Sequence, residues 1–194
     1  MARETSVVTP ERFSQGFDYP SYIDQIKVNK ARFEGFHGGF NLSPEDSAFF
    51  KELAQRPNGP AKMMVIGEDW CGDVIRGLPI LAHIADAAGI PISIFPRDSH
   101  PDIMNEFLKD GKHMSIPVAV FYTANHEYIC HWIERPAVAA REQSEIEKAI
   151  RDETPGIDDQ AFGRERRART GAKADDWIAA TVVELKELLA ESIA

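Results

Sequence analysis

The chain has 194 residues, of which 43% are hydrophobic, and this is enough for one packed domain with extensions. Charged residues make up 27%, which does not indicate a disordered chain. Its net charge of -9 at pH 7 disfavours nucleic acid and anionic membranes as partners, because a negative surface repels both. Two cysteines make no disulfide framework, and no run has the character of a secretory or membrane-spanning segment. We therefore expect a cytoplasmic protein with no nucleic-acid and no membrane partner.

Residues 1–60 are predicted to form a helical N-terminal extension. Apolar side chains at helical spacing run from Tyr22 to Phe36 and predict one helix that ends at the following glycine pair. A second helix is expected to begin at Ser43, which suits the N-cap, with Pro44 in the first helical position.

Residues 61–152 are predicted to form the core, with the element order β-α-β-α-β-β-α. The strands are expected over residues 62–67, 90–95, 118–122 and 128–133, and the helices over residues 71–88, 101–109 and 136–150. The last two strands are separated by a short polar segment, which indicates an antiparallel hairpin. This order predicts an α/β fold with a mixed central sheet of about four strands flanked by helices.

Residues 153–194 are predicted to form a helical C-terminal tail, within what remains a single domain overall. A break at residues 154–156 is followed by a group of basic side chains, namely Arg164, Arg166, Arg167, Arg169 and Lys173. We expect this group to face solvent or to pair with the protein's own acidic surface. A final helix over residues 175–193 has an apolar side that packs on the core or, if exposed, forms a homodimer contact.

Three sequence motifs accompany this element order. Trp70-Cys71-Gly72 follows a buried strand and opens a helix, Leu78-Pro79-Ile80-Leu81 lies farther along that helix, and Ser115-Ile116-Pro117 precedes the third core strand. Together they resemble the thioredoxin family, whose motif is Trp-Cys-Gly-Pro-Cys. The resemblance covers roughly residues 60–150 and implies a thioredoxin fold in which the peptide bond before Pro117 is cis.

The resemblance also implies a site built around Cys71. A cysteine at a helix N-terminus meets unpaired N–H groups and the positive end of the helix dipole, which stabilise the thiolate that attacks disulfides. In the family, the residue before the cis-proline pairs its backbone with a bound substrate, and the glycine after the cysteine lets another chain approach the sulfur. The predicted catalytic residues are Cys71 and Asp73, and the predicted substrate-binding residues are Trp70, Gly72, Ile116 and Pro117.

The motif departs from the family pattern after Gly72. Val74 stands where the family has its second, resolving cysteine, so Cys71 cannot form the usual internal disulfide. Asp73 replaces a proline, and its negative charge disfavours the thiolate. Two interpretations of Asp73 stay open, a general acid or base and a carboxylate favoured in the first turn of a helix. Val65 replaces a buried aspartate of the family, which is consistent with the absence of a second thiol.

Cys130 is expected to be a buried packing residue on the outer strand of the hairpin. That strand lies two strands from the one that leads to Cys71, at least about 9–10 Å away. A disulfide needs Cα atoms within about 7 Å, so the two cysteines are not expected to pair. His126, Cys130 and His131 lack the spacing of metal ligands, and no metal or organic cofactor is expected.

These observations predict a monothiol protein that exchanges thiols and disulfides with a disulfide-bearing protein or a low-molecular-weight thiol such as glutathione. Two alternatives stay open. A monothiol glutaredoxin-like protein would hold glutathione or an iron–sulfur cluster, although Asp73-Val74 does not match the Cys-Gly-Phe-Ser motif of such glutaredoxins. A redox-inert binding module would use the groove beside Pro117 for protein contacts.

Overall fold

The computed structural model describes residues 6–193. The chain divides into two compact units, one made of residues 1–134 and 185–194 and the other of residues 135–184. Among the described residues, no helix combines the length and the apolar character needed to cross a membrane.

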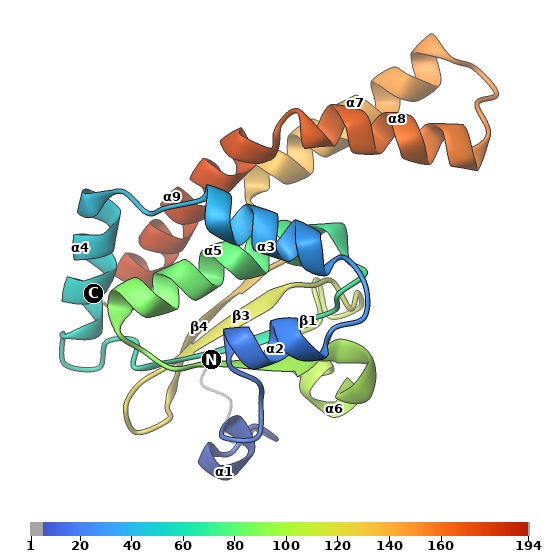
Figure 1. Cartoon of the computed structure of the whole chain (residues 1–194). Helices are drawn as coiled ribbons and strands as arrows, with labels where there is room; N and C mark the ends of the chain where they lie inside the picture. The colour runs from blue at the N-terminus through green and yellow to red at the C-terminus, as the bar shows by residue number, and fades with distance from the viewer. Residues whose placement is uncertain (1–5, 194) are drawn as a thin grey trace. The chain divides into compact units, whose positions relative to one another are not determined.

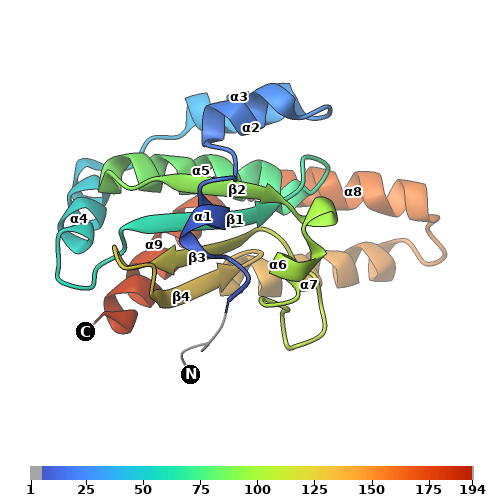
Figure 2. The same ribbon diagram turned by 90° about the horizontal axis from the view of Figure 1, so that it is seen from below.

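The first unit contains a four-stranded mixed sheet in the order β2-β1-β3-β4 (Figures 1 and 2). Its strands are β1 (Lys62–Gly67), β2 (Ile92–Pro96), β3 (Val118–Tyr122) and β4 (Tyr128–Ile133). β1 pairs in parallel with β2 and antiparallel with β3, and β3 forms an antiparallel hairpin with β4. The strand bounds predicted for β1, β3 and β4 are confirmed, and β2 begins two residues later than expected.

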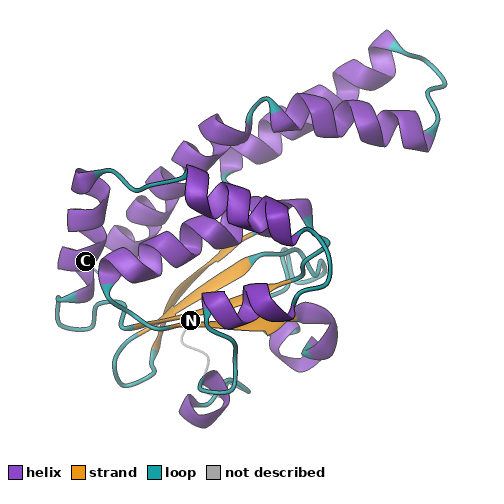
Figure 3. Cartoon of the chain, viewed as in Figure 1, coloured by secondary structure: helices purple, strands orange, loops and turns teal. Residues whose placement is uncertain are grey.

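Helix α5 (Gly72–Ala88) packs on β1, and α3 (Lys30–Gly39) and α4 (Pro44–Ala54) pack on α5. Figure 2 shows α5 as the layer next to the sheet, with α3 on its outer side. Gly89 ends α5 with a left-handed φ of 68°, as the sequence predicted. The strand residues between Met63 and Ile66 are fully buried, so the sheet carries the core on both faces. Figure 3 distinguishes these helical and strand layers. The α/β thioredoxin-like fold predicted from the sequence is confirmed.

The single helix predicted between Tyr22 and Phe36 is wrong. The chain forms α1 (Pro10–Phe13), then α2 (Tyr19–Gln25), and breaks before α3. The break occurs because Ile26 is extended, with a ψ of 152°, and Asn29 is left-handed, with a φ of 60°. The backbone N–H groups of this linker bond to a carboxylate far along the chain, which the helical spacing could not reveal.

The start of α4 confirms the predicted cap. The side chain of Ser43 accepts a hydrogen bond from the backbone N–H of Asp46 at 3.0 Å, and Pro44 occupies the first turn. Lys186 of α9 (Ala174–Ser192) forms an ion pair with Asp46 at 2.6 Å, so the C-terminal end of α9 is attached to α4.

The helix predicted over residues 101–109 is also wrong, because α6 covers only Pro101–Met104. A short helix η1 (Arg97–Ser99) precedes it. Beyond Met104 the chain turns through short bonds, including the N–H of Phe107 to the carbonyl of Met104 at 3.0 Å. Phe107, which lies in this turn, is buried in the core.

The second unit contains α7 (Ala137–Glu153), α8 (Asp159–Gly171) and the first half of α9. The predicted break at residues 154–156 is present, with Gly156 at a φ of 80°. Basic residues of α8 pair with acidic residues of α7, including Arg169 with Glu153 at 2.6 Å and Arg166 with Glu147 at 3.4 Å. This agrees with the expectation that the basic group meets the protein's own acidic surface.

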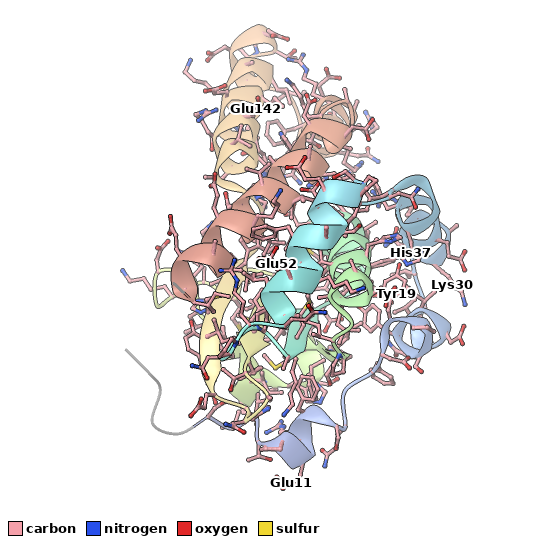
Figure 4. The ribbon with its side chains drawn as sticks, turned by 90° about the vertical axis from the view of Figure 1, so that its left-hand side faces the viewer. Glu11, Tyr19, Lys30, His37, Glu52 and Glu142 are labelled. Carbon is pink, nitrogen blue, oxygen red and sulfur yellow. The ribbon has the colours of Figure 1, made fainter. Side chains whose placement is uncertain are left out.

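Three rings are stacked where α2, α3 and α5 meet. Tyr19 stacks on His37 with 4.8 Å between the ring centroids, and His37 stacks on His83 of α5 at 4.3 Å. Figure 4 labels Tyr19 and His37 on neighbouring helices. The Nε2–H of His83 donates to the backbone carbonyl of His37 at 2.9 Å. The stack therefore joins the N-terminal extension to the central helix.

This stack makes the stability of the fold dependent on pH. Burial, and then the neighbouring His83, lower the pKa of His37 below its ordinary value, against an opposing effect of Asp86. The unfolded chain therefore binds a proton at His37 more readily than the folded chain, so stability falls as the pH drops below about 6.5. We expect His37→Phe, which keeps an aromatic ring, to reduce the loss of unfolding free energy between about pH 7 and pH 5, measured by urea denaturation. An exposed-site control, His113→Gln, should keep the wild-type pH dependence, and an unchanged dependence in His37→Phe would contradict the prediction.

Candidate functional site

Cys71 lies at the N-terminus of α5, directly after the loop that follows β1. It is the N-cap residue of this 17-residue helix, and its side chain makes no capping bond. Its half-buried Sγ instead lies 3.6 Å from the backbone carbonyl oxygen of Ile116, to which the thiol donates. The Ile116–Pro117 peptide bond is cis. The structure thus brings the two predicted parts of the site, 45 residues apart in sequence, into contact.

Two glycines allow α5 to approach its neighbours this closely. A Cβ on Gly67, the last residue of β1, would lie 2.8 Å from Cγ1 of Val74, so a side chain there would displace the first turn of the helix. A Cβ on Gly77 would lie 3.2 Å from Cγ of Pro117. Val74 is fully buried against this strand end, which makes the position of the missing cysteine part of the packed core.

Trp70, the residue before Cys71, and Met114 are both exposed, and Arg97 contacts both of them. Their side chains are 51% and 52% exposed, which is unusual for large apolar residues. The guanidinium of Arg97 lies over the Trp70 ring at 4.9 Å and donates to the carbonyl of Met114 at 3.3 Å. Met114 had no signal in the sequence, because it lies in the irregular segment between α6 and β3.

Asp73 is neutralised by a neighbour on its own helix. Its carboxylate pairs with Arg76 at 2.6 Å, and both side chains are largely buried, with 13% and 16% exposed. The ion pair reduces the opposition of Asp73 to a thiolate at Cys71. The sequence interpretation omitted Arg76, although the i, i+3 spacing on a predicted helix is a recognisable signal for such a pair. Asp73 does occupy the first helical turn, and a role as acid or base stays a prediction.

The two acidic residues before Trp70 are held by backbone N–H groups. Glu68 accepts from the N–H of Asp98 at 2.7 Å, and burial is the largest cause that raises the pKa of its carboxyl. Asp69 accepts through Oδ2 from the N–H groups of Lys27 and Val28, at 2.9 and 3.2 Å. The α2–α3 linker therefore contacts the loop that carries Cys71, a contact that no local pattern predicts. Figure 1 shows this linker passing the start of α5.

A sequence profile described as thioredoxin matches residues 16–148. The chain belongs to the thioredoxin family. A crystal structure of a protein of unknown function from Pseudomonas aeruginosa is similar to it, with a TM-score of 0.65, 18% identity and coverage of 97% of this chain and 100% of that one. An HIV epitope-scaffold is similar with a TM-score of 0.58, 16% identity and coverage of 93% and 98%. At these identities the two structures share the fold alone. No curated protein matches the chain.

The second cysteine of this thioredoxin-family chain is remote from the site. Cys130 lies on β4, which β3 separates from β1, so the predicted separation of two strands is confirmed. Its side chain is 6% exposed, and burial raises the pKa of its thiol to about 11 despite the Ser192 hydroxyl. Cys130 is a buried packing residue, as predicted.

His126 and His131, the histidines on either side of Cys130 in the sequence, contact aromatic side chains. Within residues 6–193, no three or more His, Cys, Asp or Glu side chains are grouped so that they could hold a metal ion. His126 instead stacks on Tyr122 at 4.5 Å, and His131 lies within 2.6 Å of the Tyr128 hydroxyl.

The burial of the two thiols predicts selective alkylation. At about pH 8 we expect iodoacetamide to modify Cys71 and to leave Cys130 unmodified until the chain unfolds, because only the thiolate reacts. Peptide mass spectrometry after timed quenching measures both sites, and urea-unfolded protein is the control in which both react. Modification of Cys130 in the folded chain at a rate comparable to that of Cys71 would contradict this expectation.

Proposed function

We propose that this protein carries out thiol–disulfide exchange through Cys71. The position of the sulfur carries the proposal, since it lies at the N-terminus of a long helix and 3.6 Å from the Ile116 carbonyl. The N–H groups and dipole of the helix end stabilise the thiolate, and the backbone beside Pro117 can pair with an extended chain. Membership of the thioredoxin family supports the same chemistry.

The exchange takes place in two balanced steps. The Cys71 thiolate attacks one sulfur of a substrate disulfide, forms a mixed disulfide with it, and releases the other sulfur as a thiolate that takes up a proton. An external thiolate then attacks the substrate sulfur of the mixed disulfide, and Cys71 leaves as a thiolate. The external thiol ends in a disulfide with the substrate sulfur, so these two steps exchange one disulfide partner for another, and a second external thiol completes the two-electron reduction. An external thiol is needed because Val74 provides no resolving sulfur.

The predicted neighbours would shape this reaction without taking part in electron transfer. Trp70 offers an exposed side chain in the residue before Cys71, and Gly72 has open space where a Cβ would stand, so a substrate chain can approach. Ile116 and Pro117 would hold the substrate backbone. Arg76 offsets the negative charge of Asp73. The substrate class is a disulfide-bearing protein or a low-molecular-weight disulfide.

Mixed-disulfide formation tests the proposal. In a Cys130→Ser background, we expect the protein to react with an oxidised model peptide at least about tenfold faster than free cysteine at equal thiolate concentration. Mass spectrometry should place the adduct on Cys71, and Cys71→Ser in the same background should give none. A rate equal to that of free cysteine would reject the exchange function and favour a redox-inert binding module. A brown anaerobic preparation with sulfur-to-iron absorbance would instead favour the glutaredoxin-like alternative.

Restoring a second thiol should change the product of the reaction. In Val74→Cys, the new thiol lies in the first turn of α5, three residues after Cys71, and we expect it to resolve the mixed disulfide internally. The oxidised variant should then accumulate an intramolecular disulfide rather than an adduct, as measured by intact mass and by loss of alkylation at both positions. Val74→Ala is the matched control for the smaller side chain and should retain the adduct. An adduct that persists in Val74→Cys would contradict this expectation.

A further inference from the structure

We infer that the α2–α3 linker, residues 26–29, positions Cys71 for exchange, with Asn29 and Asp69 as the positioning residues. The inference rests on the proposed function of Cys71 and extends it to the N-terminal extension. Its basis is a set of hydrogen bonds that joins the linker to the residues directly before the Trp70-Cys71 pair.

The carboxylate of Asp69 makes the first contact. One oxygen, Oδ2, accepts from the backbone N–H groups of two consecutive residues, Lys27 at 2.9 Å and Val28 at 3.2 Å. Hydrogen bonds to an ionised carboxylate are stronger than bonds between neutral groups. Because Asp69 is only two residues before Cys71, these bonds fix the loop that carries the sulfur.

The side chain of Asn29 makes the second contact and does not cap α3, the helix that it precedes. Asn29 occupies the N-cap position of α3, where an asparagine ordinarily accepts a bond from the helix N–H groups, yet it makes no such bond. Its Nδ2 instead donates to the backbone carbonyl of Asp69 at 2.9 Å. The left-handed backbone at this position, with a φ of 60°, suits asparagine and turns the side chain away from capping.

Glu68, the residue before Asp69, is also held by hydrogen bonds. Glu68 accepts the N–H of Asp98, and the N–H of Cys71 bonds to the carbonyl of Glu68 at 3.2 Å. Tyr22 of α2 is 1% exposed, and its ring packs edge-on against Phe33 of α3. Burial raises the pKa of the Tyr22 phenol, and the charges of Glu68, Asp69 and Cys71 raise it further.

The linker therefore constrains where the sulfur lies relative to the Ile116 backbone. A small alkylating reagent needs only an accessible thiolate, whereas a peptide disulfide must contact Cys71 and the Ile116 segment together. Loss of the linker bonds should therefore slow the peptide reaction far more than alkylation. The rate of the peptide reaction depends on how the sulfur and the bound disulfide are oriented to each other, and the linker bonds maintain that orientation.

The experiment uses the full chain in the Cys130→Ser background. Asp69→Asn removes the charge and keeps an oxygen that can accept from Lys27 and Val28, whereas Asp69→Ala removes both. Asn29→Gly accepts the left-handed backbone without strain and removes the amide. Glu52→Ala, which removes an exposed carboxylate of α4 whose ion pair with Arg56 does not involve the linker, is the surface-charge control. For each protein, the pH profile of iodoacetamide alkylation gives the thiolate fraction, and the peptide-disulfide rate is compared at equal thiolate concentration.

We expect Asp69→Ala and Asn29→Gly to lose about tenfold in the peptide-disulfide rate and to stay within about twofold of wild type in alkylation. Asp69→Asn should lose less of the peptide-disulfide rate than Asp69→Ala, because it keeps weaker, neutral hydrogen bonds to the linker. Glu52→Ala should keep both rates within about twofold of wild type. Equal peptide rates in all variants would overturn the inference and leave the proposed function intact. An equal loss in both reactions would also overturn it, since the linker would then support only the fold. A wild-type peptide rate no better than that of free cysteine would reject the proposed function and the inference with it.

Discussion

The contact between the Cys71 sulfur and the Ile116 carbonyl is the constraint on which the site depends. It requires the first turns of α5 to approach both the end of β1 and the Pro117 ring. Gly67 and Gly77 make this approach sterically feasible, because a Cβ at either position would meet Val74 or Pro117. The burial of Val74 follows from the same packing. Val74, which stands where the family has its second cysteine, is therefore part of a close-packed core. In such a core a change of even one methyl group affects stability.

Several carboxyl groups lie close to Cys71 in the sequence, but the sequence alone does not show which partners they have. Glu68, Asp69 and Asp73 place three carboxyl groups within three residues of Cys71, which taken alone disfavours a thiolate. Each is engaged in the structure, Glu68 and Asp69 with backbone N–H groups and Asp73 with Arg76. Arg76 offsets the charge of Asp73, and the N-terminus of α5 favours a thiolate. The N–H groups that bond to Glu68 and Asp69 are neutral, so these two carboxyl groups remain the acidic part of the site.

Two of the contacts that join the N-terminal extension to the core involve α2, α3 and the linker between them. At one, the stacked rings of Tyr19, His37 and His83 connect α2 and α3 to α5. At the other, the linker between α2 and α3 bonds to Asp69. A helical pair attached at both places restricts how the start of α5 can move relative to the extension. The N-terminal extension therefore contacts the residue directly before the Trp70-Cys71-Gly72 motif.

The sequence by itself determined the fold class, the order of the strands and helices, and the place of the cysteine at a helix start. It did so because hydrophobic periodicity, caps such as Ser43 and Gly89, and the Trp70-Cys71-Gly72 motif are local signals. Only the tertiary structure decided the break at Asn29, the early end of α6, and the contact of Arg97 with Trp70 and Met114. Each of these depends on partners distant in sequence, as when Asp69 takes N–H groups that a continuous helix would have used internally. Local propensity carries no information about such long-range partners.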